Sequence, residues 1–330
     1  MMPTLSVVLP VHNEAVHLPA TIEALVEALT ASDFEAELVL VDDGSTDGSA
    51  DAARQALRGR APFSVVSQPN RGRFEARRAG VEVARGEWVL LLDGRVRLHA
   101  GSLAFVSSRV DTGERVWTGH VEVLADGNPF GVFWKLLAEL AWADYFDDPR
   151  TTSFGGDDFD RYPKGTTSFL APRSLLLEAI AAFRSRYSNS RAANDDTPLI
   201  RWIAEREPIH VSPRFTCDYR PRSTLRAFLR HSYHRGLVFL DGHGRRESRF
   251  FPLVVAFYPV SAVLALAALR RPAVVPLAAG STAAAAAALG LAHSRERSEV
   301  ASLALLAPVY GLAHGAGMWR GLLMMLTNPR

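Results

Sequence analysis

Acidic side chains follow short apolar segments at three places in this sequence of 330 residues. They are Glu14 after residues 5–11, Asp42 and Asp43 after residues 38–41, and Asp93 after residues 88–92. Ligands of an open α/β sheet bind beyond the carboxyl ends of its strands. If these apolar segments are strands, the carboxylates therefore stand where a ligand binds.

A second acidic pair, Asp195 and Asp196, precedes Thr197 and Pro198. A carboxylate in a ligand cleft can take a proton from an attacking hydroxyl group, which is general-base catalysis. The same residues suit the start of a helix, because an acidic cap and a proline in the first turn both favour one. The two roles are compatible, and both stay open at this point.

The spacing of the apolar segments predicts alternating strands and helices. Residues 5–11, 38–41, 63–66 and 88–92 are short and apolar, and helical patterns lie between them at residues 18–29, 52–57 and 71–84. Strand–helix–strand order is typical of parallel sheets with helices on both faces. The fully apolar run 88–92 suits a central strand.

Two motifs give this pattern a family resemblance. They are Pro10-Val11-His12-Asn13-Glu14 and Val41-Asp42-Asp43-Gly44-Ser45-Thr46-Asp47-Gly48-Ser49. Together they resemble the family 2 glycosyltransferases, most strongly over residues 5–95 and more weakly to about residue 240. The resemblance implies the GT-A fold, a Rossmann-like α/β domain whose mostly parallel sheet has helices on both faces. It also implies a nucleotide-diphosphate sugar as donor.

The resemblance implies that the donor is held by Pro10, Val11, Glu14, Asp42, Asp43 and Arg73. Carboxylates accept hydrogen bonds. Asp43 can therefore accept one from an N–H of the nucleotide base, and Glu14 can accept them from the ribose hydroxyls. A turn role is the alternative for Asp42, and residues 45–47 are more typical of a helix cap. For Arg73, Arg77 and Arg78 the alternative is a solvated charged face.

The stretch Asp93-Gly94-Arg95-Val96-Arg97 departs from the family pattern. Relatives usually carry Asp-x-Asp here, and the second acid is replaced by Arg95. Asp93 with substrate phosphate can still hold Mg²⁺ or Mn²⁺, because these ions keep several waters. Alternatively Arg95 or Arg97 stabilises the phosphate charge, since guanidinium groups bind phosphate well. His231 or His234 is a further candidate metal ligand, although a lone histidine is more often structural.

The resemblance extends more loosely to the acceptor side. Asn194-Asp195-Asp196-Thr197-Pro198-Leu199 resembles the Glu-Asp-x-x-Leu motif of the family, and Asp196 then takes the place of the catalytic base, with Asp195 beside it. Gly165, Thr166 and Thr167 resemble the small residues that line the sugar pocket. Arg235 resembles the arginine of a Gln-x-x-Arg-Trp motif that contacts the diphosphate. A basic patch that meets lipid headgroups is the alternative for Arg235.

The composition changes character near residue 250. Residues 250–269, 273–292 and 300–319 contain no Asp, Glu, Lys or Arg. Helices of about 20 residues span the hydrocarbon core of a bilayer. We therefore expect a catalytic domain over residues 1–240 and a membrane domain over 241–330 with about three transmembrane helices. A buried helical domain is the alternative.

Charge and cysteine content limit the other possibilities. The formal net charge is +2, which argues against nucleic acid as the main partner. Cys217 is the single cysteine, so no disulfide forms within the chain. Residues 5–11 are too short for a secretory signal. Arg245, Arg246 and Arg249 before the first span favour the cytosolic side, whereas Arg270 and Arg271 then face outward against the rule.

Together these patterns predict a multi-pass protein of the inner membrane with a cytoplasmic catalytic domain. Its expected reaction is inverting transfer of a sugar from a cytosolic nucleotide sugar to a lipid-linked or cell-envelope glycan acceptor. One alternative is a polyprenyl-phosphate glycosyltransferase. An alternative of another class is a non-catalytic membrane scaffold that binds nucleotide sugars. The sequence patterns do not identify the sugar or the oligomeric state.

Overall fold

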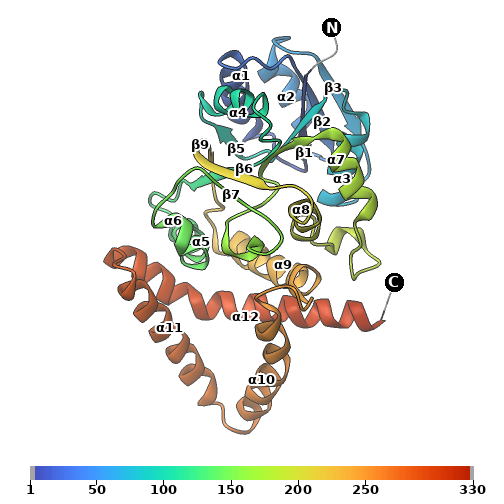
Figure 1. The fold of residues 1–330 in the computed structure, drawn as a ribbon. Helices are drawn as coiled ribbons and strands as arrows, with labels where there is room; N and C mark the ends of the chain where they lie inside the picture. The colour runs from blue at the N-terminus through green and yellow to red at the C-terminus, as the bar shows by residue number, and fades with distance from the viewer. Residues whose placement is uncertain (1–3, 328–330) are drawn as a thin grey trace. The chain divides into compact units, whose positions relative to one another are not determined.

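The computed structural model describes residues 4–327 and contains two compact units (Figure 1). The first unit comprises the chain up to residue 122 together with residues 142–184 and 195–220. The second comprises residues 123–141, 185–194 and the chain from residue 221. The chain thus passes repeatedly between the units. The expected boundary at 240/241 falls inside a helix, Leu225–His243, of the second unit.

Up to β4, the strands of the first unit and the helices between them follow the predicted alternation. The strands are β1 (Leu5–Val11), β2 (Ala36–Asp42), β3 (Phe63–Ser67), β4 (Trp88–Leu92), β5 (Val96–Leu98), β6 (Val116–Val123), β7 (Thr152–Phe154), β8 (Ser168–Pro172) and β9 (Ile209–Tyr219). The helices are α1 (Leu18–Thr30), α2 (Ser49–Leu57), α3 (Arg73–Val83), α4 (Ser102–Val110), α6 (Ala143–Phe146), α7 (Arg173–Ala182) and α8 (Thr197–Ala204), with a 3-10 turn η1 (Phe159–Arg161).

The described strands form one mixed sheet in the order β3-β2-β1-β4-β8-β6-β9-β5, with β7 paired to β9. The pairs β1–β2, β1–β4 and β2–β3 are parallel, as the apolar segments predict. Beyond β4 the ladders are antiparallel, beginning with β8 beside β4. The parallel expectation therefore holds for the N-terminal half of the sheet.

Two hydrophobic cores lie on the two faces of this sheet. Leu5, Val7 and Leu9 of β1 point to the side covered by α1, α2 and α4. Val8 points to the other side, which α3, α7 and α8 cover. Successive side chains of a strand alternate between faces, so apolar residues at every position of β1 except Ser6 explain why both faces are buried. The expected doubly covered sheet is confirmed (Figure 1).

The second unit is helical. It contains α5 (Pro129–Ala141), a 3-10 turn η2 (Ser190–Ala192), α9 (Leu225–His243), α10 (Phe251–Arg270), α11 (Val274–Ala292) and α12 (Arg297–Thr327). Phe133 and Leu136 of α5 are buried against Phe228 and Leu303, so this aromatic helix faces a core within its unit. The helices α10, α11 and α12 are long and apolar enough to cross a membrane.

Candidate active site

Asp43 follows β2 and fastens the loop that precedes α3. The residue is 5% exposed. Its Oδ1 accepts hydrogen bonds from Gln68 Nε2 and the Arg71 backbone N–H, both at 2.7 Å, and its Oδ2 accepts one from the Gly72 N–H at 2.9 Å. A carboxylate suits this position because it accepts several N–H groups at once. Asp43 therefore holds the start of α3, and its contact with a nucleotide base stays a prediction.

The ends of β1 and β2 lie side by side. Pro10 and Val11 are the last residues of β1, and Val11 is beside Asp42 in the parallel register. Asp42 Oδ1 accepts the Ser45 N–H at 2.8 Å, which is the turn role considered from the sequence. Val11 is 2% exposed, so its backbone is the part that remains for a ligand contact.

The loops that follow these two strands are bonded to each other. Asn13 Oδ1 accepts the Thr46 N–H at 2.8 Å, and Asp47 Oδ2 accepts the Ala15 N–H at 2.9 Å. Asn13 has a φ of 58°, a left-handed conformation that asparagine tolerates better than most residues. The motif residues thus build one cross-braced loop pair at the carboxyl ends of the strands.

Glu14 and Arg95 form an ion pair at this edge of the sheet. Arg95 Nε donates to Glu14 Oε1 at 2.9 Å. The arginine that replaces the second acid of the family motif therefore neutralises the carboxylate predicted to bind the ribose. His17 lies beside this pair, where burial and then the charge of Arg95 lower its pKa. The charges of Arg97 and Arg220 also lower the pKa of His17, so this side of the site is basic.

Arg77 in α3 joins Asp93 to the second acidic pair. Its Nη2 donates to Asp93 Oδ1 at 2.9 Å, and its Nη1 donates to Asp195 Oδ2. Arg77 is 5% exposed, which contradicts a solvated charged face for this residue. Burial lowers the pKa of Arg77, and the charges of Asp93 and Asp196 oppose this; an arginine nevertheless stays protonated in a protein. Two acids predicted from separate motifs are thereby brought to one guanidinium.

Arg73, one turn before Arg77, adds a second cation to the cluster. Arg73 Nη2 lies 3.5 Å from Asp195 Oδ1, and its side chain is 51% exposed. The exposed position leaves Arg73 accessible to a ligand, while Arg77 is enclosed. Arg78 pairs with Glu75 at 2.7 Å on the surface of α3, so the solvated-face alternative holds for Arg78.

Asp196 is the N-cap of α8. Its Oδ1 accepts the Thr197 N–H at 2.6 Å, and Pro198 occupies the first turn, so the predicted capping role is confirmed. The negative charge of Asp196 acts to raise the pKa of Arg77, so this carboxylate belongs to the same electrostatic cluster as Asp93. Its role as a base stays a prediction.

The small residues predicted to line the sugar pocket lie against these acids. The Asp93 N–H donates to Thr167 O at 3.0 Å. A Cβ atom added to Gly165 would lie 4.0 Å from Asp196 Oδ2. Thr166 is buried, with 2% exposed. The pairing of β8 with β4 brings this stretch beside Asp93, and its contact with a sugar stays a prediction.

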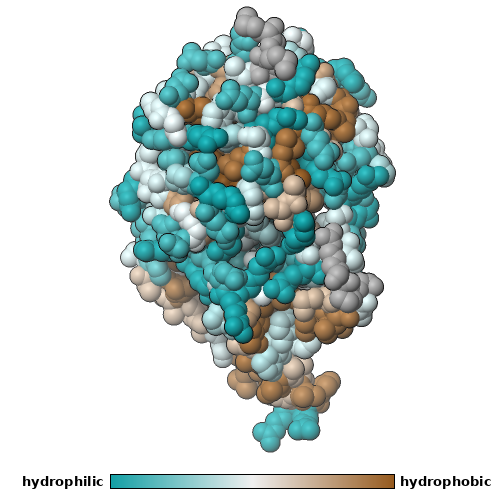
Figure 2. All heavy atoms as spheres, turned by 45° about the vertical axis from the view of Figure 1, so that its right-hand side comes forward, coloured by the Kyte–Doolittle hydropathy of each residue, from teal (hydrophilic) through white to brown (hydrophobic). Residues whose placement is uncertain are grey.

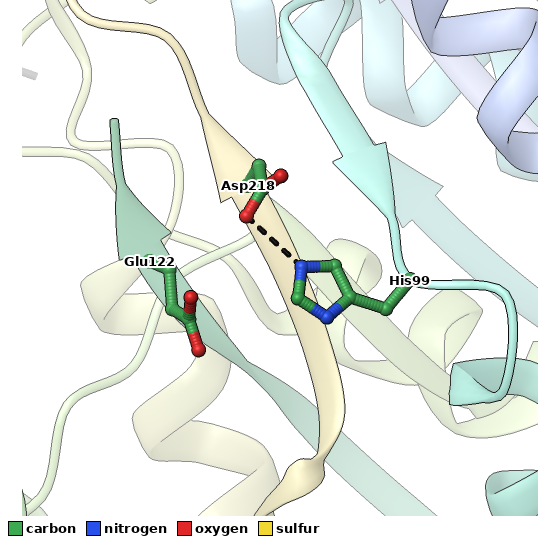
Figure 3. A group of neighbouring side chains, drawn as sticks. All are labelled: His99, Glu122 and Asp218. Atoms are coloured by element: carbon green, nitrogen blue, oxygen red, sulfur yellow. Dashed lines mark hydrogen bonds and ion pairs between the residues drawn. The ribbon is translucent and has the colours of Figure 1, made fainter. Parts of the chain in front are cut away.

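A separate group of potential metal ligands lies just after β5 and on β6 and β9 (Figure 3). His99, Glu122 and Asp218 each place one ligand atom within 4.8 Å of the others. His99 Nε2 lies 2.9 Å from Asp218 Oδ1, and Arg97 stands opposite Asp218 in the strand register. An exposed hydrogen-bonded group beside an arginine accounts for this geometry without a metal.

Arg235, His231 and His234 lie in α9 of the second unit. The ring of His231 contacts Trp134 with centroids 4.7 Å apart. Arg235 also interacts electrostatically with Tyr310 of α12, which belongs to the same unit. The contact of Arg235 with a donor, and a metal-binding role for the histidines, stay predictions.

Two residues of the cluster were not predicted as site residues: Arg77 was considered only for a solvated charged face, and Gln68 was not considered. Arg77 lies four residues after Arg73, and this spacing places both on one helix face; that spacing is the signal that identifies it. Gln68, which donates to Asp43, carries no comparable signal in the sequence.

Solved structures of two glycosyl-transferring proteins share this fold. The mannosyltransferase PcManGT from Pyrobaculum calidifontis, in complex with GDP-Man and Mn2+, aligns with 97% of this chain and 88% of its own at a TM-score of 0.56 and 18% identity. S. aureus TarS 1-349, in complex with UDP-GlcNAc, aligns with 98% of this chain and 91% of its own at a TM-score of 0.54 and 15% identity. At such identities the likeness shows the fold, which is the GT-A fold of glycosyltransferases.

Sequence comparison adds the family. Residues 6–100 match the family described as Glycosyl transferase family 2. The undecaprenyl-phosphate 4-deoxy-4-formamido-L-arabinose transferase of Aeromonas hydrophila is 39% identical over 90 residues, and the dodecaprenyl-phosphate galacturonate synthase of Rhizobium johnstonii is 37% identical over 92. These matches cover 27% of this chain and 28% and 27% of the two relatives. Residues 6–100 of this chain are therefore similar to glycosyltransferase family 2, as its two motifs predict.

Proposed function

We propose that the chain is an inverting glycosyltransferase that moves a hexosyl or pentosyl group from a nucleotide-diphosphate sugar to a lipid-linked acceptor. The observation that carries this proposal is the guanidinium of Arg77 between Asp93 and Asp195. It links the acid of the donor-side motif to the acid pair of the acceptor-side motif. Donor and acceptor chemistry then share one site in the first unit.

The donor side is the cross-braced loop pair after β1 and β2. Backbone groups of Pro10 and Val11 and the carboxylates of Asp42 and Asp43 stand at these strand ends, where ligands of α/β sheets bind. The structural neighbours support this assignment, because PcManGT was solved in complex with GDP-Man and TarS in complex with UDP-GlcNAc. The half-exposed Arg73 supplies a guanidinium suited to the diphosphate.

A divalent cation fits the donor side through Asp93. The Asp93 side chain is 27% exposed, and Arg77 occupies its Oδ1. One carboxylate is sufficient for Mg²⁺ or Mn²⁺ when phosphate oxygens and water complete the ligand set. When bound, such an ion would neutralise charge on the departing diphosphate.

Asp196 is the proposed general base. Its carboxylate caps α8 and lies near Gly165, next to the predicted sugar pocket. Removing the proton of an acceptor hydroxyl in the transition state contributes about 10²–10⁴-fold to a rate. A single displacement assisted in this way inverts the anomeric carbon.

A second acceptor class is a polyprenyl phosphate. The names of the two relatives above support it, since both act on polyprenyl phosphates. A phosphate acceptor carries no alcohol proton, so replacing Asp196 would affect its reaction far less. The matched segment covers the donor half of the site, so this evidence bears on the acceptor only indirectly.

The test uses membranes that contain the full-length protein. A panel of radiolabelled nucleotide sugars is supplied with and without added polyprenyl phosphate, and label in the lipid extract is counted. We expect one donor to be used, with activity lost in EDTA and restored by Mn²⁺ or Mg²⁺. Asp196→Asn should lower transfer to a hydroxyl acceptor by about 100-fold or more.

The control is Arg78→Gln, which changes a surface pair on α3 and should leave the rate unchanged. Transfer by Asp196→Asn at close to the wild-type rate would favour the phosphate acceptor. Absence of transfer or hydrolysis with every donor would contradict the proposed function and favour a non-catalytic scaffold that binds nucleotide sugars.

A further inference from the structure

The helix α12 differs from α10 and α11 in what surrounds it. Within the described chain, Val254 is the one buried residue of α10 and Gly290 the one buried residue of α11. Apolar side chains therefore face outward around both helices, among them Leu269 at 82% and Leu277 at 68% exposed. In α12 six residues are buried, and the mean hydropathy of an 18-residue stretch of α12, 1.4, is below the 2.1 and 1.7 of the corresponding stretches of α10 and α11.

The buried face of α12 packs at backbone distance against α9. A Cβ atom added to Gly317 would lie 2.1 Å from Tyr233 O, and one added to Gly236 would lie 1.9 Å from His314 O. Glycine is required at both positions for the two backbones to approach so closely. Wherever α12 lies, α9 therefore lies beside it.

The helix α9 is polar. Arg226, Arg230 and Arg235 are exposed on it, and it also carries Asp241. Charged side chains at the centre of a bilayer are costly and rare. A spanning α12 would bring this charged partner into the hydrocarbon region.

Contacts with the other two helices show which parts of the hairpin α12 touches. Near the start of α12, Val300 lies 3.1 Å from the Cβ position of Gly290 in α11. In its C-terminal half, Trp319 Nε1 donates to Ser261 Oγ of α10 at 3.1 Å, and Tyr258 Oη of α10 donates to Met318 O at 3.3 Å. These contacts join α12 to the last part of α11 and the middle of α10.

The distance of these contacts from the hairpin tip follows from helix geometry. α10 ends at Arg270 and α11 begins at Val274, so the tip is the short link between them. At 1.5 Å per residue, Gly290 lies about 24 Å along α11 from the tip, and Tyr258 and Ser261 lie about 18 Å and about 14 Å along α10 from it. A spanning α12 would instead reach the tip with one end. Figure 1 shows α12 running across the open end of the α10–α11 hairpin.

The face of α12 opposite α9 is apolar and exposed. Its members are Leu305 at 73%, Leu312 at 75%, Leu323 at 50% and Leu326 at 66%. Their spacing places them on one side of the helix. Figure 2 shows hydrophobic residues gathered over the helices at this end of the chain. A helix that is apolar on one side and packs against a charged helix on the other can lie parallel to the membrane surface, with its apolar side in the lipid.

We infer that α12 lies along the membrane surface on its leucine stripe, while α10 and α11 alone cross the bilayer as a hairpin. The occupant of the stripe is the lipid bilayer, because the stripe is continuous with the apolar surface of the hairpin. The chain then crosses the bilayer twice, so the residues before α10 and the end of α12 lie on the same side of the membrane. Three crossing helices would separate them.

The test labels single introduced cysteines in sealed membrane vesicles of one orientation with an impermeant maleimide. The variants of the full chain are Asp51→Cys in the first unit, Arg271→Cys at the hairpin tip and Thr327→Cys at the end of α12, all of which are exposed positions. The native Cys217 is fully buried, so the unmodified chain measures background.

We expect positions 51 and 327 to react from one side and position 271 from the other. Labelling of 51 and 327 from opposite sides would overturn the inference, and so would labelling of all three from one side. Fluorophore-labelled Leu312→Cys should also be quenched more strongly by a headgroup quencher than Leu264→Cys, by at least twofold. Equal quenching would place α12 as deep as the middle of α10. None of these outcomes depends on transfer activity, so the proposed function is tested separately.

Discussion

Arg77 is the residue on which the arrangement of the candidate site depends most. It is enclosed, and it contacts acids from two different segments of the chain. Removing one partner of a buried ion pair costs about 3–5 kcal/mol, because the other charges stay buried without compensation. The site is therefore sensitive to a single side chain that does not need to touch substrate.

Replacing Arg77 with Gln should lower both stability and transfer. We expect a loss of about 3–5 kcal/mol in the free energy of unfolding and at least a tenfold fall in kcat. Arg77→Lys keeps the charge but cannot reach both acids with one planar group, so its effect should be intermediate. Thermal unfolding in detergent and transfer assays at saturating donor measure the two quantities.

The matched control is Arg78→Gln, one residue along the same helix, with a side chain that is 43% exposed. It should change the free energy of unfolding by less than about 0.5 kcal/mol. If Arg77→Gln behaves like this control, the bridge has no structural or functional weight.

Glu37 gives the fold a pH dependence. Burial alone would raise the pKa of Glu37, but the hydrogen bonds from Arg85 and Ser6 outweigh it, so its pKa lies below the usual value. A lowered pKa means that the stabilisation is complete at neutral pH and is lost as pH falls through the folded-state pKa. Glu37→Gln should therefore cost about 1–3 kcal/mol at pH 7.

The difference between wild type and Glu37→Gln should begin to shrink as the pH falls below the unfolded-state pKa of about 4.3, and it should be smallest below the lowered folded-state pKa, where the glutamate is protonated in both states. Melting temperatures of both chains across pH 3–8 measure it. Glu35→Gln, two residues earlier and exposed, is the control and should show no such trend. A constant difference at every pH would assign the effect to packing instead of charge.

Individual site residues could be located from the sequence more readily than their contacts. Asp43, Asp93 and Asp196 stand in recognisable motifs, and all lie at ends of strands or helices. The three hydrogen bonds to Asp43 come from residues 68–72, which pair with it only after the sheet forms. No local pattern predicts such a contact. The burial of Arg77 could not be predicted either, because it also depends on contacts with distant segments of the chain.

At the scale of elements, the contact between α9 and α12 is set by glycines. Both helices present backbone to each other at Gly236 and Gly317. Gly317→Ala should destabilise the second unit, because the added methyl group meets the Tyr233 carbonyl and neither backbone can move alone. We expect a loss of about 1–3 kcal/mol, as for an overpacked core.

Gly311→Ala is the matched control on the same helix. Nothing lies within 4 Å of a Cβ atom at position 311, so alanine should be neutral or stabilising by up to about 1 kcal/mol through helix propensity. Melting temperature in detergent and protease resistance compare the two variants. Equal behaviour would show that α9 and α12 do not pack as closely as described.

The elements themselves were largely predictable. The strand predicted at 88–92 is β4, and the helix predicted at 71–84 is α3. These two predictions are correct because each kind of burial has its own sequence pattern. A strand buried on both faces is an unbroken apolar run, and a helix buried on one face has apolar residues at helical spacing. The antiparallel strands beyond β4 are short or separated by long loops, so their partners are fixed by tertiary contacts that no local pattern records.

At the scale of the molecule, the division into units could not be read along the chain. A change of composition near residue 250 suggested a boundary at 240/241, whereas the second unit also takes residues 123–141 and 185–194. Asp241 shows why: it accepts hydrogen bonds from Ser185 Oγ at 2.9 Å and the Asn194 N–H at 2.8 Å. Contacts between distant segments define the unit, and hydropathy marks only its apolar part.

The pairing of Glu14 with Arg95 limits how this chain can change. Introducing an aspartate at position 95 would recreate the acidic motif of its relatives, yet it would also strip Glu14 of its counter-ion and set two carboxylates against each other. The two positions are therefore coupled, and an ancestor or an engineered variant that regains the acid must alter residue 14 in the same step or pass through a less stable intermediate.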